Sequence, residues 1–276
     1  FGKVIKIVGD TIDLNNEIET NIEVFNIRNS FSDQIELELD RLASKITTKE
    51  LRGRKDFRNI LTFTIDPIDA KDFDDAISIS RLKNNNIEIG VHIADVSHYV
   101  KSSSEIDKEA FLRAFSVYFP GTVVSMLPEK LSNNICSLKP HEDKLAFSVV
   151  LEISNLSQIK SSWIGKTIIN SNKRFTYQEA ELIIDQKSGK YSQELILLNN
   201  IAEKIRQKRI KGGAIEFNRA DVSFEIDQLG EPVKVFKKTP LKSHKLVEDF
   251  MLMANKIVAE KLSKLNRSIY RVHDWP

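Results

Sequence analysis

Residues 64–80 read TIDPIDAKDFDDAISIS, and this stretch decides how the rest of the chain is interpreted. Apolar residues of strand type precede it at 61–65 and continue from it at 76–82, which predicts two strands of one sheet. Because the acidic run lies between two strands, some of its carboxylates are expected to be held close to the sheet, where solvation is incomplete. Lys71 is the only basic side chain among the five aspartates, which are Asp66, Asp69, Asp72, Asp74 and Asp75.

Crowded carboxylates carry an electrostatic cost. Two of them about 5 Å apart repel by roughly 3 kcal/mol at an effective dielectric near 20, so a converging group must protonate, stay solvated or bind a cation. Oxygen ligands without a neighbouring His or Cys select a hard ion, Mg²⁺ or Ca²⁺. A calcium EF-hand is excluded, because loop positions six and twelve counted from Asp72 are Ile77 and Lys83. A metal site is therefore predicted, and a solvated acidic turn stays open as the alternative.

Magnesium held by aspartates typically serves phosphate chemistry, which makes a phosphodiester the leading substrate hypothesis. The chain contains no GxxxxGK[ST], GxSxG or GxGxxG pattern, so phosphate-binding-loop, serine-hydrolase and dinucleotide-binding functions have no support. A haloacid-dehalogenase-like nucleophile also fits poorly, because residues 72–76 (DFDDA) lack the Thr or Val expected after the second aspartate.

Composition sets the broad class of the protein. With 41% hydrophobic and 29% charged residues, a globular fold is expected. The 41 basic and 39 acidic side chains nearly balance, but acidic residues are in excess over 1–100 and basic residues over 200–276. This asymmetry permits both a cation and a polyanion as partners. Cys136 is the single cysteine and no apolar run reaches the ~18 to 20 residues of a membrane span, so a cytoplasmic protein without membrane contact is expected.

Three segments differ in pattern along the chain. Residues 1–12 alternate as one strand with no sheet of their own and are interpreted as the end of a preceding β-rich domain. Residues 13–59 are interpreted as a helical connector, and 60–276 as one domain of mixed α and β structure. Within that domain a loop region is expected over 118–138. Helices are expected over 104–115, from the capping box that begins at Thr176, over 192–211 and over 243–265.

Ordered blocks along the chain carry a family resemblance. They are TIDPIDAKDFDDAISIS, VHIADVSHYV, YFPGTVVSMLPEKLSNNICSL, KRFTY, GGAIEF, HKLVEDFMLMAN and IYRVHDWP. In order and spacing, the region from about residue 50 onward resembles the RNB catalytic domain of the ribonuclease II and ribonuclease R family, with ribonuclease R the closer match. The resemblance implies an α+β fold, a mixed sheet flanked by helices, which follows an OB barrel of the cold-shock type.

The resemblance also implies an activity and a set of site residues. The activity is processive 3′-to-5′ hydrolysis of single-stranded RNA to nucleoside 5′-monophosphates with Mg²⁺, by a protein that is expected to be monomeric. Asp66 and Asp75 match direct metal ligands, Asp72 a ligand or support, and Asp74 the residue most tied to the chemical step. Tyr177 matches a tyrosine near the scissile phosphate.

Three further residues match RNA-binding positions of the family. Tyr118 and Phe217 match aromatic residues that clamp the terminal bases, and Glu248 matches a glutamate near the 3′-terminal nucleotide. Stacking of a base on an aromatic ring contributes roughly 1 to 3 kcal/mol without reading sequence. The structural alternatives are core packing for the aromatic residues, and for Glu248 a favourable position in the first turn of a helix.

One departure from the family concerns activity. Family members continue beyond Pro276 into a block of the type HFTSPIRRY, which supplies an arginine to the reacting phosphate, and this block is not in the chain. The chain is therefore expected to be a fragment with weak or no activity. Two rival functions stay open: an RNA-binding protein on the same fold whose catalysis has lapsed, and a phosphatase acting on small phosphate esters.

Overall fold

The computed structural model describes residues 2–4, 7, 14–42, 46–154, 158–215, 221–227, 232–265 and 269–270. The chain divides into two compact units. The first comprises Phe1–Ser44, Val96–Ser132 and Asn218–Thr239, and the second comprises Lys45–Asp95, Asn133–Phe217 and Pro240–Pro276. The expected domain boundaries at residues 12 and 59 stay predictions, and the strand expected over 1–12 falls mostly outside the described residues.

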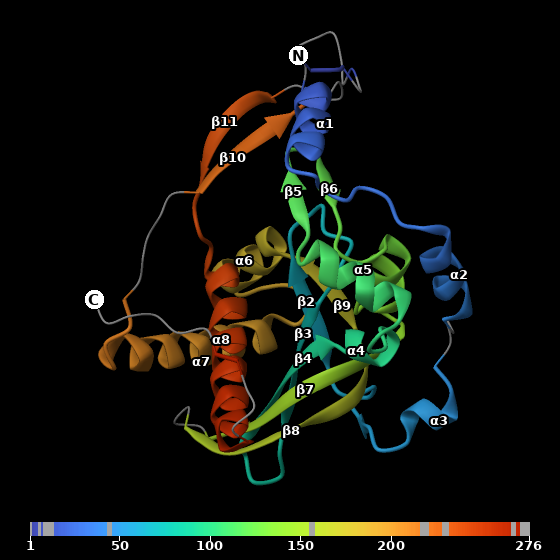
Figure 1. The fold of residues 1–276 in the computed structure, drawn as a ribbon. Helices are drawn as coiled ribbons and strands as arrows, with labels where there is room; N and C mark the ends of the chain where they lie inside the picture. Colours follow the sequence, from blue (N-terminus) through green and yellow to red (C-terminus); the bar gives the residue numbers. More distant parts are fainter. Residues whose placement is uncertain are drawn as a thin grey trace. The chain divides into compact units, whose positions relative to one another are not determined.

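In the described part of the second unit, seven strands form one sheet in the order β1-β8-β7-β4-β3-β2-β9 (Figure 1). Neighbours are antiparallel except at the two edges, where β9 runs parallel to β2 and β1 parallel to β8. This mixed sheet confirms the predicted α+β class. The strands are β1 (Lys55–Asp56), β2 (Thr62–Asp66), β3 (Asp75–Arg81), β4 (Ile87–Ala94), β7 (Asp143–Ile153), β8 (Ile159–Asn170) and β9 (Lys173–Thr176).

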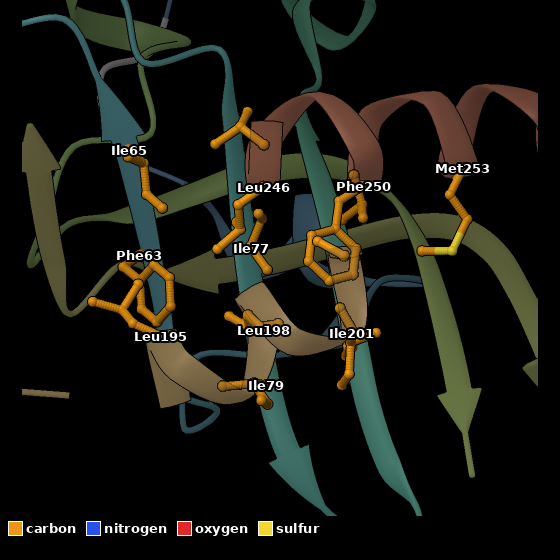
Figure 2. Packing of buried hydrophobic residues seen from close by; sticks show 14 of the residues in the cluster. Phe63, Ile65, Ile77, Ile79, Leu195, Leu198, Ile201, Leu246, Phe250 and Met253 are labelled. Carbon is orange, nitrogen blue, oxygen red and sulfur yellow. The ribbon is translucent and has the colours of Figure 1, made fainter. Parts of the chain in front are cut away.

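Helices α6 (Tyr177–Gln186), α7 (Ser192–Lys211) and α8 (Lys242–Leu262) pack on this sheet through one hydrophobic core. Apolar residues recur every three or four positions along α7 and α8, so each helix turns one apolar side toward the strands. The second unit also contains α3 (Thr48–Leu51) and the 3₁₀ turn η2 (Ser263–Leu265). None of the helices in the described ranges is long and apolar enough to cross a bilayer. Figure 2 shows the core residues Phe63, Ile65, Ile77, Ile79, Leu195, Leu198, Ile201, Leu246, Phe250 and Met253.

In its described residues, the first unit contains short helices and two antiparallel pairs of strands. Ser104 caps α5 by accepting a hydrogen bond from the Asp107 N–H, as its capping pattern predicted. The loop expected over 118–138 is partly wrong, because Gly121, at φ 78°, closes a hairpin there and a π-helix follows it. The elements are α1 (Leu14–Val24), α2 (Asp33–Arg41), α4 (Val96–Tyr99), α5 (Glu105–Arg113), β5 (Val117–Phe119), β6 (Thr122–Val124), β10 (Asp221–Ile226) and β11 (Pro232–Lys238), with the π-helix η1 (Lys130–Ile135) at the boundary.

A buried polar group lies within the second unit. Arg54 binds Asp95 with an Nη2 to Oδ2 distance of 2.6 Å, and both side chains are only 2% exposed. The ring of His92 has no exposed surface, and its nitrogens hydrogen-bond the hydroxyls of Ser148 at 2.7 Å and Ser78 at 2.8 Å. Asp95 and His92 therefore have structural partners, although sequence alone could not separate a structural role from a role in the site.

The burial of His92 predicts a pH dependence of stability. Burial lowers its pKa from 6.5 to about 3. Between about pH 6.5 and pH 3 the unfolded chain therefore binds a proton that the folded chain does not, so the contribution of this residue to stability is fully present above pH 6.5 and is lost as the pH falls through this window. Between pH 7 and pH 5 the loss should reach about 2 kcal/mol. Urea unfolding at both pH values should show a smaller acid loss for His92→Gln than for the wild type, and equal losses would contradict the prediction.

Candidate active site

The aspartates lie where β2 ends and β3 begins. Asp66 is the last residue of β2 and Asp75 the first of β3, and the two strands are antiparallel neighbours, so both residues lie at the same end of these strands. We call this end of the strands the acidic edge of the sheet. On the other side of β2, the parallel strand β9 places Thr176 opposite Asp66. Tyr177 follows directly as the first residue of α6. Strand pairing therefore places this tyrosine next to the acidic edge.

Arg174 on β9 holds the start of the loop that joins the two strands. Its Nη2 donates to the carbonyl oxygens of Pro67 and, at 3.0 Å, of Ile68. Its guanidinium group also lies over the ring of Phe73, 5.5 Å from the centroid. The same positive charge lowers the pKa of the Asp66 carboxyl and so opposes the effect of burial. Arg174 thus has two roles, in loop geometry and in local electrostatics.

Asp66 is the most deeply placed carboxylate of the cluster. It is 7% exposed, and burial raises its pKa to about 7. The Thr64 side chain lowers this pKa, whereas the charges of Asp75 and Asp72 raise it further. Its Oδ2 atom is buried and has no hydrogen-bond partner among the described residues. A buried carboxylate oxygen without a donor is costly unless a proton or a cation compensates it.

The neighbouring carboxylates show the same mutual repulsion. Burial raises the pKa of Asp75 to about 6, and the charge of Asp74 adds to the shift. Asp74 keeps an exposed surface, yet the protein packed beneath it partly desolvates its carboxylate, and this raises its pKa together with the charge of Asp72. Asp66, Asp72, Asp74 and Asp75 therefore form one electrostatically coupled cluster.

A divalent cation fits this cluster by its chemistry. The donors are carboxylate oxygens, which hard cations prefer, and the Asp66 Oδ2 atom has no hydrogen-bond partner in the described part of the chain, so a cation would supply one. A cation would also offset the repulsion that raises these pKa values. Within the described ranges, however, no three His, Cys, Asp or Glu side chains are arranged to hold one ion. Without an ion, the described carboxylates thus supply suitable donor atoms but are not arranged as a complete set of ligands around one point.

Tyr177 is fixed at this edge from both sides. Thr176 caps α6 by accepting from the Glu179 N–H at 3.0 Å, which confirms the predicted capping box. The ring of His244 from α8 stacks on the Tyr177 ring, with centroids 3.9 Å apart and an interplanar angle of 16°. Burial and the charges of Asp75 and Asp66 raise the pKa of Tyr177 to about 12, so its phenol stays protonated at neutral pH.

His244 is a residue of the candidate site that sequence reasoning missed. It lies in the quoted block HKLVEDFMLMAN, but no local pattern distinguishes it from a surface residue in the first turn of a helix. Its Nδ1 accepts the Leu241 N–H at 3.1 Å. The neighbouring Ser243 donates from Oγ to the Tyr177 carbonyl at 2.8 Å. These contacts join the beginnings of α6 and α8, and only the folded chain reveals them.

Comparison with known proteins decides the family. The model of the RNB domain matches residues 54–276. The chain belongs to the RNB domain family. It is 42% identical over 254 residues to ribonuclease R of Chlamydia pneumoniae, which covers 91% of this chain and 38% of that protein. The family resemblance read from the sequence blocks is therefore confirmed.

Solved structures agree with this assignment. Mycoplasma genitalium RNase R in complex with ribose-methylated single-stranded RNA matches this RNB domain with a TM-score of 0.89 at 29% identity, over 97% of this chain and 42% of that chain. Yeast Ssd1, described as a pseudonuclease, matches with a TM-score of 0.69 at 20% identity and shows a shared fold alone. The chain spans well under half the length of these relatives.

The predicted RNA-binding residues of the RNB domain lie apart from the aspartates in sequence. Tyr118 is on β5 in the first unit and is 72% exposed, so core packing does not account for it. Phe217 lies outside the described residues.

Glu248 is exposed in the second turn of α8, four residues after His244 and therefore on the same side of the helix. The alternative for Glu248, a first-turn position favoured by the helix dipole, is wrong because α8 begins at Lys242.

Two basic residues that could follow an RNA backbone have a partner within the protein. Arg209 donates from Nη2 to Asp249 Oδ1 at 2.8 Å, and Arg206 lies 3.7 Å from Asp249 Oδ2. Asp249 is 1% exposed, so these arginines neutralise a buried carboxylate between α7 and α8. These ion pairs join the two helices.

Proposed function

We propose that this RNB domain is the catalytic part of a Mg²⁺-dependent exoribonuclease that degrades single-stranded RNA processively from its 3′ end to nucleoside 5′-monophosphates. The observation that carries the proposal is the coupled carboxylate cluster at one sheet edge, next to a tyrosine held in a stack. The M. genitalium relative is bound to single-stranded RNA in its solved structure, which supports RNA as the substrate class.

Each residue of the cluster has a proposed task. Asp66 and Asp75 would hold magnesium, with Asp72 as a further ligand or a support. Bound magnesium supplies activation of a water and stabilisation of the leaving oxygen. Asp74, at the exposed side of the cluster, would orient the attacking water or accept its proton. The protonated phenol of Tyr177 would donate a hydrogen bond to the scissile phosphate, because its raised pKa keeps the proton in place.

The RNA strand would be held largely by stacking and by contacts at its end. Tyr118 and Phe217 would stack on unpaired bases, an interaction that tolerates any sequence. Glu248 would contact the 3′-terminal nucleotide. We further propose that the protein acts as a cytoplasmic monomer. Cys136 is buried and its thiol pKa is raised to about 12, so it is not available for a disulfide between copies.

Metal removal provides the direct test. The full-length protein is incubated with Mg²⁺ and 3′-labelled single-stranded RNA. The label should appear first in a mononucleotide. On 5′-labelled RNA the protein should leave few intermediates, because a processive enzyme stays bound. Excess EDTA should lower the rate by at least about a hundredfold, and added Mg²⁺ should restore it.

The two rival functions give different results in the same assay. A protein with lapsed catalysis would bind RNA and reduce its mobility in a native gel, and it would not shorten the RNA with or without metal. A phosphatase would release inorganic phosphate from small esters and leave the RNA chain intact. Internal cleavage that leaves the 3′ label on long products would contradict the exonuclease proposal.

A further inference from the structure

A buried serine from a distant part of the chain contacts the aspartate loop on both sides of Asp72. Ser137 follows η1 and has no exposed surface. Its Oγ accepts the N–H of Phe73 at 3.0 Å and donates to the carbonyl oxygen of Lys71 at 3.0 Å. The next residue, Leu138, donates its N–H to the Phe73 carbonyl at 2.8 Å. The Ser137 hydroxyl therefore hydrogen-bonds the backbone of both residues that flank Asp72, as donor to Lys71 and as acceptor from Phe73.

We propose that Ser137 is a positioning residue for the metal-binding carboxylates, an inference that rests on the proposed function. Through its bonds to the backbone at Lys71 and Phe73, Ser137 restrains the two residues that flank Asp72 and so sets the orientation of the Asp72 side chain. The adjacent Leu138 N–H adds a separate backbone restraint at the Phe73 carbonyl, next to Asp74. The carboxylates repel one another, so an unrestrained loop would relax and separate them. Ser137 keeps them close before the cation arrives, and binding then requires less rearrangement.

A purely structural role makes a different prediction. A buried serine that only fills space and satisfies two backbone groups would lower stability when removed, without changing the response to magnesium. Ser148 serves as the matched control, because it is equally buried, lies in the same unit and hydrogen-bonds His92 and Thr167 instead of the loop. Ser137→Ala and Ser148→Ala each remove one buried hydroxyl.

The test measures thermal unfolding of the complete chain against Mg²⁺ concentration, in the absence of RNA. Ser137→Ala is expected to need about 10 to 100 times more Mg²⁺ for half-maximal stabilisation, as is typical when a group supporting metal ligands is lost. Ser148→Ala should match the wild type in this value, and Ser137→Thr, which restores a hydroxyl, should recover most of the affinity. If Ser137→Ala does not fold, Ser137→Cys keeps the size with a weaker donor and should show the same direction of change.

Two outcomes would overturn the inference in distinguishable ways. Equal Mg²⁺ requirements for Ser137→Ala, Ser148→Ala and the wild type would show that Ser137 is structural only, while the proposed function stands. A wild type that Mg²⁺ does not stabilise at all would remove the metal site itself, and with it both the proposed function and the positioning role.

Discussion

Replacing Asp74 by asparagine is expected to reduce RNA hydrolysis by at least about a hundredfold while leaving RNA affinity within a few-fold of the wild type. The backbone of Asp74 is fixed independently of its side chain, because its carbonyl accepts the Ala94 N–H at 2.9 Å. Asparagine has nearly the same size but cannot accept a proton. The change therefore removes the chemical function and leaves the fold. Initial rates on labelled RNA and filter binding with the same RNA would measure the two effects separately.

Asp69 supplies a control within the same loop. Its side chain is exposed, and the electrostatic coupling that raises the pKa values of Asp66, Asp74 and Asp75 does not involve it. Asp69→Asn removes the same charge a few residues away and should change the rate by less than about threefold. If Asp69→Asn and Asp74→Asn lowered the rate equally, overall negative charge in the loop would matter more than a specific role of Asp74.

Local periodicity was sufficient to predict the elements that carry the core. The apolar spacing over 192–211 predicted α7 at its observed bounds, because Leu195 and Leu198 recur on one helical side and Gly213, at φ 98°, follows the helix end. The strands around the aspartates were also visible, since both are short apolar runs that meet at the acidic stretch. In each case the sequence pattern that predicts the helix or strand lies within that same helix or strand.

The missing parts of the site depend on contacts between distant segments. Strand β9 has only four residues, too few for an alternating pattern, yet its parallel pairing with β2 places Tyr177 beside Asp66. Nothing near His244 or Ser137 in the sequence indicates that one stacks on Tyr177 and the other holds the loop around Asp72. The sequence therefore predicted the carboxylates that the fold brings into one coupled cluster, but the residues that contact this cluster and its loop became visible only with the fold.

Replacing Asp66 by asparagine is expected to stabilise the metal-free chain and to abolish its response to magnesium. In EDTA at pH 8 the buried Asp66 carboxylate is ionised, faces neighbouring negative charges and leaves Oδ2 without a partner among the described residues. An uncharged amide avoids this cost. We expect a gain of about 1 to 3 kcal/mol in unfolding free energy at pH 8, because burial of the polar amide offsets part of the electrostatic relief. Saturating Mg²⁺ should stabilise the wild type by about 2 to 3 kcal/mol and the variant hardly at all.

The pH dependence of this gain identifies its cause. The pKa of Asp66 rises from 3.8 in the unfolded chain to about 7 in the metal-free fold, so the fold binds the extra proton between these values and loses stability as pH rises through them. The advantage of Asp66→Asn should therefore shrink by about 2 to 3 kcal/mol when urea unfolding in EDTA is repeated at pH 5. Asp69→Asn, which removes an exposed carboxylate, should show no such change between the two pH values. If Asp66→Asn were less stable than the wild type in EDTA at pH 8, the carboxylate would not be under repulsive strain, and the electrostatic reason for placing a cation there would be lost.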